Sequence, residues 1–430
     1  MKRIKDELNE MQKEAVNLIL QGKNVFISGA GGTGKSFIIK ALARNPLLKV
    51  VVAAPTGTSA SLIGGVTLHS LLKLPIGVVG PNFKPAEKNP VLDACNTIVV
   101  DEISMVRFDL FSFMLKSIRA SEARTGVRKS IVLLGDFYQL PPVITSRDRE
   151  ALTKLYGFCG SGYAFKAASW GEVNPFFVEL TEQMRQNSSE EEFVNALDDI
   201  RHGCTKTLSF FDRCVVDSEE CVGTLLSAKR KEVEKVNLEK LEALDGGEVR
   251  EYHAIIEGEF DTREAIAEFH LKLKVGAPVL ILVNDYAGNA YSNGTRATVV
   301  AMEEDSVTVA LESGLEVKLD YYEWQQYSYI VDEETNDLKK VVVGSMRMIP
   351  VNLAYAITIH KAQGMTLSNI TVCVDSIWAS GMLYTALSRV KSIHGLHLKS
   401  PIKPKMVKVD KDVEAFYRWC RDSSLRKRIS

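Results

Sequence analysis

A glycine-rich stretch, GAGGTGKS at residues 29–36, has residue types suited to holding phosphate groups. It follows an apolar run and opens into the helical pattern SFIIKALAR. Glycines let backbone N–H groups approach phosphate oxygens, and the helix N-terminus adds a favourable dipole. The lysine of such a pattern reaches the β- and γ-phosphates of a nucleotide, and its serine holds Mg²⁺. The stretch therefore predicts an ATP site formed by Gly29, Gly31, Gly32, Thr33, Gly34, Lys35 and Ser36.

Two acidic residues and a glutamine follow later apolar runs and fit the rest of a phosphate-hydrolysis site. Asp101, in VVDEIS, stands where it can hold Mg²⁺ together with Ser36. Glu102 beside it can orient or deprotonate a water for attack on the γ-phosphate. Gln139, in LLGDFYQLPPV, can contact the γ-phosphate or that water. Taken alone, the acidic pair would be read as a solvated strand end and Gln139 as a turn residue. Combined with the glycine-rich loop, all three favour a catalytic role.

The elements that must position these groups begin with four short apolar runs, NVFISG, KVVVAAP, TIVVDE and SIVLLGD. Each is bounded by glycine, proline or charge, as buried strands are. Such strands with helical crossovers indicate a parallel α/β sheet, whose ligands bind at the carboxyl ends of the strands. We expect an amphipathic helix before the first strand. Residues 71–95, rich in proline, glycine and asparagine, are expected to leave the sheet as an insertion.

The rest of the chain changes character twice. The α/β pattern resumes from 176 to 297, with FFVEL, VGTLLSA and PVLILV as strands. Residues 298–349 have short alternating strands typical of a small antiparallel barrel, after which ITVCV and GLHLKS return to the buried type. We therefore expect one α/β domain at 1–175, a second at 176–297 and 350–430, and a β-domain at 298–349 inserted into the second.

The composition is that of a globular protein of two or three domains, with 430 residues, 46% apolar and 25% charged. A net charge of −1 gives no bulk attraction for a polyanion, so a nucleic-acid site would be a local groove. Seven cysteines form no CxxC pair, which argues against structural zinc and disulfides and fits a reducing cytoplasm. His394 and His397 are interpreted as ordinary histidines. Neither a secretion signal nor a membrane span is expected.

A set of motifs in order along the chain resembles that of the superfamily 1B DNA helicases, and most of all the PIF-type (petite integration frequency) family. The motifs are GAGGTGKS, APTGTSA, GVTLHS, VVDEIS, GDFYQLPPV, LTEQMRQ, TIHKAQGMTL and YTALSRV. RecD-like helicases and the phage Dda helicase are similar to this family and resemble it as relatives. The resemblance implies two tandem RecA-like domains with ATP between them, an SH3-like β-domain in the second and a short wedge in the first. It also implies 5′-to-3′ movement along single-stranded DNA.

The same resemblance assigns further nucleotide contacts. Gln12 is similar to the glutamine that reads adenine, and Gln363 and Gly364 would approach the nucleotide side. Arg185 in QMRQ and Arg389 in LSRV resemble two arginine fingers supplied by the second domain, groups worth ~10³–10⁵ in rate. The stretch EEFVNALDDIRHG resembles a helical signature of the family, with a packing stripe and a polar anchor at Phe193, Leu197, Ile200 and Arg201.

The DNA contacts implied by the resemblance divide between the two domains. The first domain would contribute Thr56, Gly57, Thr67 and His69, and the second Thr358 and His360. Hydroxyls, amides and helix N-termini bind phosphates without reading sequence. Phe83, in GPNFKP, is the candidate pin that meets the duplex junction, weighed evenly against a loop aromatic that covers its own domain.

Three functions stay open: an ATP-dependent 5′-to-3′ DNA helicase, a single-stranded DNA translocase with weak unwinding, and an ATP-regulated DNA clamp. The complete catalytic set argues against the clamp, because a binder needs no water-orienting group. The family suggests G-quadruplexes, forks and R-loops as substrates. A monomer is sufficient because one chain holds both halves of the ATP cleft, and DNA-induced dimers stay open. We expect a bacterial or phage type enzyme in the cytoplasm, associated with the nucleoid.

Overall fold

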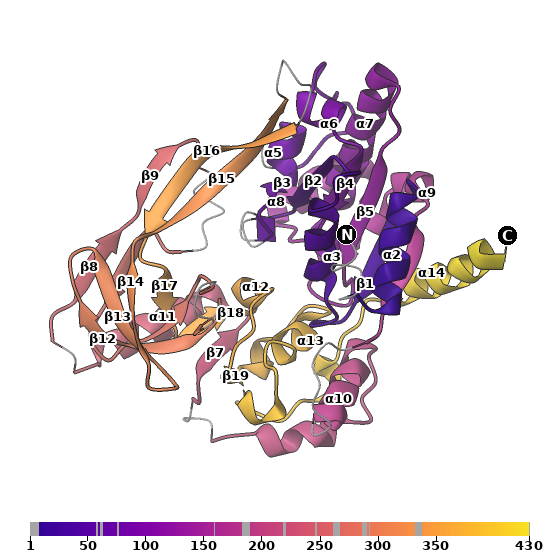
Figure 1. Ribbon diagram of the computed structural model, residues 1–430. Helices are drawn as coiled ribbons and strands as arrows, with labels where there is room; N and C mark the ends of the chain where they lie inside the picture. Colours follow the sequence, from indigo (N-terminus) through magenta and orange to yellow (C-terminus); the bar gives the residue numbers. More distant parts are fainter. Residues whose placement is uncertain are drawn as a thin grey trace.

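A six-stranded parallel sheet with helices on both faces forms the first part of the molecule (Figure 1). The computed structural model describes residues 8–429 apart from 57–58, 61–62, 75–76, 159, 183–189, 218–220, 246, 261–266, 286–289, 292 and 332–337, with the backbone alone for 327–331, 338–340 and 424–429. The sheet has the order β3-β2-β4-β5-β1-β6. Its strands are β1 (Val25–Gly29), β2 (Val50–Ala54), β3 (Val66–Thr67), β4 (Thr97–Val100), β5 (Ser130–Gly135) and β6 (Phe176–Leu180).

The four strands predicted in the first third are confirmed as β1, β2, β4 and β5. They are buried on both faces because alternate side chains enter two separate cores. Val25 and Ile27 join the core under α2 and α3, whereas Phe26 joins the core under α7 and α9. The helices of this part are α2 (Glu10–Leu20), α3 (Lys35–Ala43), α5 (Leu68–Leu72), α6 (Pro90–Ala94), η1 (Ile103–Met105), α7 (Phe108–Thr125), α8 (Ser146–Tyr156), η2 (Ala164–Lys166) and α9 (Ala168–Val173).

FFVEL is a strand, as predicted, but it belongs to the first sheet. This strand, β6, pairs with β1 in parallel, Val25 facing Phe176. The first sheet therefore extends past the domain limit expected at residue 175. Local composition identifies a buried strand but carries no information about which sheet accepts it.

A four-stranded parallel sheet forms the second part, with the order β18-β7-β19-β20. The predicted strands VGTLLSA, ITVCV and GLHLKS are confirmed within it. The strands are β7 (Thr224–Ser227), β18 (Ala356–Thr358), β19 (Ile370–Val372) and β20 (Leu396–Leu398). The helices are α10 (Glu191–Arg201), η4 (Leu208–Cys214), α11 (Arg230–Glu242), α12 (Ile359–Ala362), η6 (Val374–Ser376), α13 (Met382–Leu387), η7 (Ile393–Gly395) and η8 (Pro404–Met406). The sequence TIHKAQG thus follows directly from a buried parallel strand.

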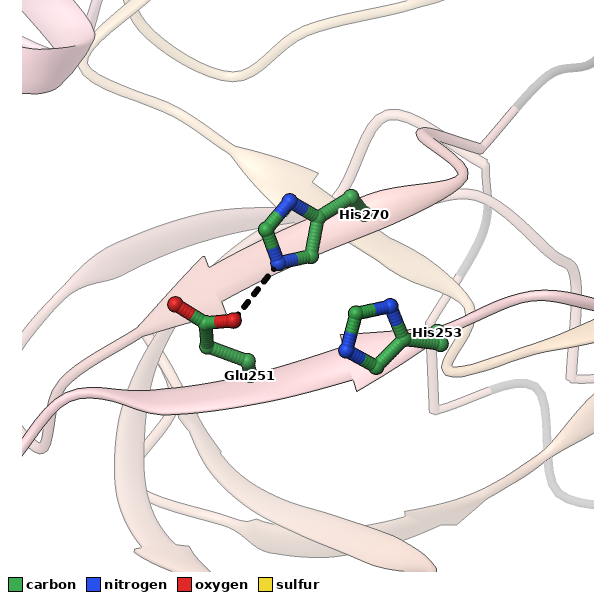
Figure 2. A group of neighbouring side chains, drawn as sticks. All are labelled: Glu251, His253 and His270. Atoms are coloured by element: carbon green, nitrogen blue, oxygen red, sulfur yellow. Dashed lines mark hydrogen bonds and ion pairs between the residues drawn. The ribbon is translucent and has the colours of Figure 1, made fainter.

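Antiparallel strands between β7 and β18 form a third region, the β-rich lobe (Figure 1). A five-stranded sheet contains β11 (Pro278–Ile281), β12 (Arg296–Met302), β13 (Ser306–Leu311), β14 (Glu316–Asp320) and β17 (Val351–Leu353). A three-stranded sheet contains β9 (Ile255–Gly258), β15 (Tyr322–Val331) and β16 (Leu338–Met348), and a two-stranded sheet contains β8 (Arg250–His253) and β10 (His270–Leu273) (Figure 2). The hairpin β15–β16 leaves the lobe and packs against α5 and α6 of the first part.

The strand PVLILV is confirmed, but its expected place in a parallel sheet is wrong. It is β11, which pairs antiparallel with both β12 and β17. A strand buried on both faces has a continuous apolar pattern in either direction, so the pattern does not report its orientation. The antiparallel region therefore starts well before residue 298. That it has an SH3-like form stays a prediction.

The last helix, α14 (Lys411–Ile429), returns to the first part rather than the second. Its buried Phe416 and Tyr417 enter an aromatic cluster beneath the first sheet. Phe416 stacks on Phe165 with ring centroids 4.3 Å apart and meets Phe137 edge-on at 5.4 Å. Within the described ranges, no helix combines the length and the apolar character needed to span a membrane.

Replacing Phe416 with alanine is expected to lower the free energy of unfolding by about 3–5 kcal/mol, because it leaves a cavity inside a packed aromatic cluster. Urea unfolding of the whole chain, followed by tryptophan fluorescence, measures this loss. Leu238→Ala, on the exposed face of α11, is the control and should change stability by no more than about 0.5 kcal/mol. Equal effects of the two changes would mean that α14 does not contribute to the core of the first part.

Candidate nucleotide and nucleic-acid site

The glycine-rich loop connects β1 to α3, as the sequence predicts. Gly32 and Gly34 have left-handed φ values of 87° and 83°, which favour glycine. A Cβ on Gly29 would lie 2.9 Å from the carbonyl oxygen of Leu180 in β6, so a side chain there has no room. Lys35 begins α3, and its Nζ donates to the carbonyl oxygens of Gly29 at 2.7 Å and Ala30 at 3.1 Å. The loop is therefore folded around its own lysine.

Lys35 is a partly buried cation with no carboxylate in direct contact among the described residues. Burial lowers the pKa of its ammonium group, and the charges of Asp136, Glu102 and Asp101 oppose that shift. Two backbone carbonyls compensate a buried ammonium less well than an anion does. The oxygens of a bound phosphate would supply that anion.

Asp101 and Glu102 directly follow β4, and their charges act on this lysine. Glu102 has a left-handed φ of 48°, an unusual conformation for a residue with a side chain, of the sort found at functional sites. The carboxylate of Asp101 accepts a hydrogen bond from the Glu102 N–H at 2.9 Å. Burial first, and then the charge of Glu102, raise the pKa of Asp101 to about 7. A cation at this point would restore the ionised form.

The second part reaches this acidic pair through Gln363. Gln363 follows α12, and its Nε2 donates to Oε2 of Glu102 at 3.3 Å. Its Oε1 is buried without a hydrogen-bond partner among the described residues, so a donor on a ligand or water could satisfy it. Gly381, before α13, approaches the backbone of Gln139 so closely that a Cβ would overlap the carbonyl oxygens of Tyr138 and Gln139. Two of the predicted catalytic groups thus contact the second part.

Arg389 lies beside the glycine-rich loop. It is 5% exposed, and its guanidinium donates to the carbonyl oxygens of Thr385 at 2.7 Å and Met365 at 3.3 Å. Its Nη2 lies 3.9 Å from the position that a Cβ on Gly31 would take. The second part therefore holds a buried cation against the loop of the first part, as an arginine finger requires.

The remaining nucleotide candidates lie near the same loop or outside the described residues. Gln12 is buried in α2, where its side chain accepts from the Asn9 N–H at 3.1 Å and donates to the Thr33 carbonyl oxygen at 3.4 Å. Gly364 follows Gln363 with a left-handed φ of 79°. Arg185 lies outside the described residues. A cavity of about 1050 Å³ opens beside Ala30 and Gly31, bordered by residues of α10 and α13.

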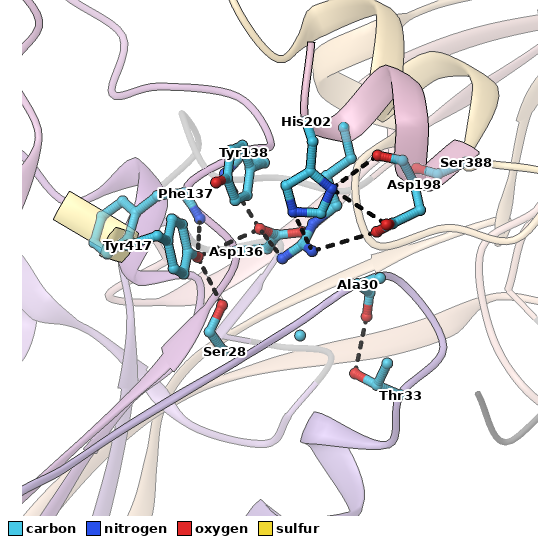
Figure 3. Close-up of polar contacts among 12 residues, drawn as sticks. Ser28, Ala30, Thr33, Asp136, Phe137, Tyr138, Asp198, His202, Ser388 and Tyr417 are labelled. Carbon is cyan, nitrogen blue, oxygen red and sulfur yellow. Dashed lines mark hydrogen bonds and ion pairs between the residues drawn. The ribbon is translucent and has the colours of Figure 1, made fainter. Parts of the chain in front are cut away.

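A buried polar network, not anticipated from the sequence, joins three distant segments around Asp136 (Figure 3). Both oxygens of Asp136 accept from Arg201 of α10, each at 3.0 Å. The hydroxyl of Tyr417 lies 2.6 Å from the Ser28 hydroxyl and accepts from the Phe137 N–H at 3.1 Å. Phe193 and Ile200 of the predicted packing stripe in α10 are buried. Arg201, the predicted polar anchor, is the cation of this ion pair. The one local sign of a role for Asp136 is its position directly after the apolar run that forms β5.

The predicted DNA residues lie at carboxyl ends of strands in both sheets. Thr56 follows β2 and bonds Ser59, and Thr67 caps α5 by accepting from the Ser70 N–H at 3.2 Å, with His69 in that helix. Thr358 ends β18 and caps α12, which contains His360. Burial lowers the pKa of His360, which favours the neutral form of its ring. Gly57 lies outside the described residues.

Phe83 is packed on its own domain and is also partly open to solvent. Its ring meets Phe113 of α7 edge-on, with centroids 6.4 Å apart, and 44% of the residue is exposed. Its carbonyl oxygen accepts from Lys116 Nζ at 2.9 Å. The contact with α7 gives the ring a firm support, and its role as a pin stays a prediction.

Comparison with known proteins agrees with this arrangement. A family model described as PIF1-like helicase matches residues 7–209. The chain is 33% identical over 431 aligned residues to ATP-dependent DNA helicase Pif1 of Bdellovibrio bacteriovorus, covering 96% of this chain and 92% of that protein. The chain belongs to the PIF1-like helicase family. The resemblance found in its motifs is confirmed.

Solved structures of the PIF1-like helicase family share the fold. Bacteroides sp. Pif1 in complex with ADP-AlF4 is 32% identical with a TM-score of 0.85, covering 96% of this chain and 97% of that one. Bacteroides Pif1 bound to ssDNA is 33% identical with a TM-score of 0.67, covering 96% of both chains. The α/β fold class with two parallel sheets is thereby confirmed.

In this PIF1-like helicase, Arg201→Met is expected to lower the free energy of unfolding by about 3–5 kcal/mol, because it leaves Asp136 buried without its cation. Urea unfolding measures the change. Arg230→Met, which breaks an exposed pair with Glu234 on α11, should cost no more than about 1 kcal/mol. Adding Asp136→Asn to Arg201→Met should recover part of the loss. If Arg201→Met behaves like the exposed control, the ion pair does not hold the two parts together.

Proposed function

We propose that this chain uses ATP to move 5′ to 3′ along single-stranded DNA and to separate the duplex ahead of it. Membership of the PIF1-like helicase family makes it an ATP-hydrolysing DNA helicase. The direction of movement, the roles of individual residues and the substrates beyond simple duplexes are the proposed content. G-quadruplexes, forks and R-loops are included among those substrates.

The observation that carries the proposal is that predicted nucleotide-site groups from both parts lie together. Lys35 and Glu102 come from the first part, and Gln363 and Arg389 come from the second. The hydrogen bond from Gln363 to Glu102 and the approach of Arg389 to Gly31 join the two sets. A site completed only when the parts meet makes hydrolysis depend on their closure, which is the coupling that a motor needs.

In the proposed reaction Lys35 binds the β- and γ-phosphates and Glu102 orients or deprotonates the attacking water. Gln139 senses the γ-phosphate, and its backbone contact with Gly381 passes that state to the second part. Arg389, together with Arg185, stabilises the charge that develops on the transferring phosphoryl group. Gln12 reads the adenine at the far end of the loop.

The residues present fit a Mg²⁺ ion. The Ser36 hydroxyl and the Asp101 carboxylate are the hard oxygen donors that this ion prefers. Asp101 is buried, and burial first and then the charge of Glu102 raise its pKa, so a bound cation would stabilise its ionised form. When bound, Mg²⁺ would neutralise charge on the β- and γ-phosphate oxygens.

Helix α12 is the proposed link between ATP and DNA. Thr358 caps its N-terminus and Gln363 its C-terminus, so the DNA-side and nucleotide-side groups are five residues apart on one short element. A displacement of this helix on ATP binding would move Thr358 and His360 relative to Thr56, Thr67 and His69. That relative movement is the proposed step along the strand.

The proposed domains are a RecA-like domain at 1–175, a second RecA-like domain at 176–297 and 350–430, and an SH3-like domain at 298–349. Three elements depart from these limits. β6 and α14 belong with the first part, and β11 belongs to the antiparallel β-rich lobe. The proposed partners are single-stranded and partly duplex DNA, in line with relatives described as bound to ssDNA and as two coordinating helicases at forked dsDNA. One chain holds both sets of nucleotide-site groups, so a monomer is sufficient, and a dimer would form only on DNA. The proposed location is the bacterial cytoplasm, on the nucleoid.

Unwinding of two matched partial duplexes, one with a 5′ tail and one with a 3′ tail, tests the proposal. We expect ATP-dependent opening of the 5′-tailed duplex alone, and loss of opening and of ATP hydrolysis in Lys35→Ala. Lys40→Ala, a lysine of the same helix α3 outside the motif, is the matched control and should retain both. Opening of the 3′-tailed duplex would contradict the direction. DNA-stimulated ATP hydrolysis without opening of either duplex would leave a translocase, and DNA binding without hydrolysis would leave the clamp.

The raised pKa of Asp101 gives the nucleotide site a pH dependence. Only the ionised carboxylate binds Mg²⁺, so Mg²⁺-dependent nucleotide affinity should be constant above about pH 7 and fall as the pH decreases below it, by up to about tenfold per unit. Titration with a fluorescent ATP analogue at fixed Mg²⁺ measures this slope. In Asp101→Asn the change of nucleotide affinity with pH should be smaller. Only the part that comes from titration of the nucleotide itself should remain. The same slope in wild type and variant would exclude Asp101 as the titrating group.

A further inference from the structure

Three side chains of metal-ligand type share one face of the two-stranded sheet β8–β10 in the β-rich lobe (Figure 2). His270 faces His253 directly across the strand pair, and Lys272 faces Glu251. Residues two apart in a strand point to the same side, so Glu251 and His253 lie on one face together with His270. Figure 2 shows the two imidazoles and the carboxylate turned toward a common point.

The candidate ligand atoms of Glu251, His253 and His270 lie close to one another. Oε2 of Glu251 lies 2.8 Å from Nε2 of His270, and the two imidazole rings are stacked with centroids 4.6 Å apart and planes 10° from parallel. One ligand atom from each residue lies within 4.8 Å of the others. Tetrahedral zinc with bonds of about 2.0–2.2 Å holds its ligand atoms roughly 3.3 Å apart. Small rotations of these exposed side chains would therefore bring all three into range.

Glu251 supplies an anionic ligand. Hydrogen bonds from Lys272 and then from His270 lower the pKa of Glu251 to about 2, so its carboxylate is an anion at neutral pH. The neutral imidazole ring is the form that binds metals. The ring of His253 has no hydrogen-bond partner among the described residues. Ion pairs of Glu251 with Lys272 and with His270 account for the positions of Glu251 and His270. They do not account for the position of His253.

We propose that Glu251, His253 and His270 bind one divalent transition-metal ion of the zinc class, with its remaining positions open to water. Two imidazole nitrogens and one carboxylate are a ligand set that zinc uses in proteins. Lys272, whose Nζ lies 2.9 Å from Oε1 of Glu251, competes with the ion for the carboxylate. The site is separate from the nucleotide site and independent of ATP hydrolysis.

The position of this site gives the ion a structural consequence. β8 continues through Ala254 into β9, and β9 pairs with β16 of the long hairpin. That hairpin packs against α5 and α6 of the first part. An ion that fixes β8 to β10 would brace the base of the hairpin and slow hydrogen exchange in both strands.

The test is metal binding by the whole chain after removal of metals with a chelator. Titration with Zn²⁺ against a chromogenic competitor should give one tight equivalent. The variant His253→Ala with His270→Ala should bind about tenfold or more weakly, because ligand removal costs at least as much as loss of a ligand's supporting group. Lys272→Met should bind more tightly than wild type, because the competing ammonium is gone. His394→Ala, a histidine of η7, should match wild type.

Substitution with Co²⁺ identifies the ligands independently. A visible d–d band without a thiolate charge-transfer band is expected, and it should disappear in Glu251→Gln combined with His270→Ala. Circular dichroism should show unchanged folding, since all three side chains are exposed. Absence of a tight equivalent in wild type, or equal binding by wild type and the double-histidine variant, would overturn the proposal. A thiolate band in wild type would do so as well, because the ion would then be on cysteine.

Discussion

The bidentate ion pair between Arg201 and Asp136 is the contact around which the two parts of the molecule are arranged. Both side chains are almost fully buried, at 5% and 0% exposure, so each charge has given up its hydration. That cost is several kcal/mol for each ion and is offset only by good geometry and further hydrogen bonds. Here two hydrogen bonds join the pair, and the guanidinium of Arg201 also lies 4.7 Å from the ring centroid of Tyr138. Asp136 directly precedes Phe137, Tyr138 and Gln139, so the pair fixes the loop that carries a catalytic candidate.

Strain and close approach concentrate around the same loop. Glu102 holds a left-handed conformation at the end of β4, and Gly381 presses against the backbone of Gln139. The conformation of Glu102 is unfavourable locally and persists because the surrounding packing determines it, whereas the approach of Gly381 is possible because glycine has no side chain. The candidate nucleotide site thus lies where the two parts of the molecule meet.

The sequence predicts well whatever depends on neighbouring residues. The apolar runs become strands, the glycine-rich loop lies between β1 and α3, and the acidic pair follows β4, since each pattern is local. The partners of Asp136 were not predictable, because Arg201 is 65 residues away and Tyr417 is 281 residues away. The sheet that accepts β6 and the direction of β11 were missed for the same reason. The approach of Gln363 to Glu102 was expected only from resemblance to a family, because no local pattern contains it.

The return of α14 to the first part has a mechanical meaning. The chain leaves the first part after β6 and comes back to it with α14, so the second part is attached at both of its ends. A body held by one tether can swivel freely, whereas a body held at two points turns mainly about the line that joins them. The anchor at Tyr417 is bonded to Ser28, one residue before the glycine-rich loop begins. The axis of that rotation therefore passes close to the glycine-rich loop. A small change in angle about it would give a larger displacement at the distant β-rich lobe.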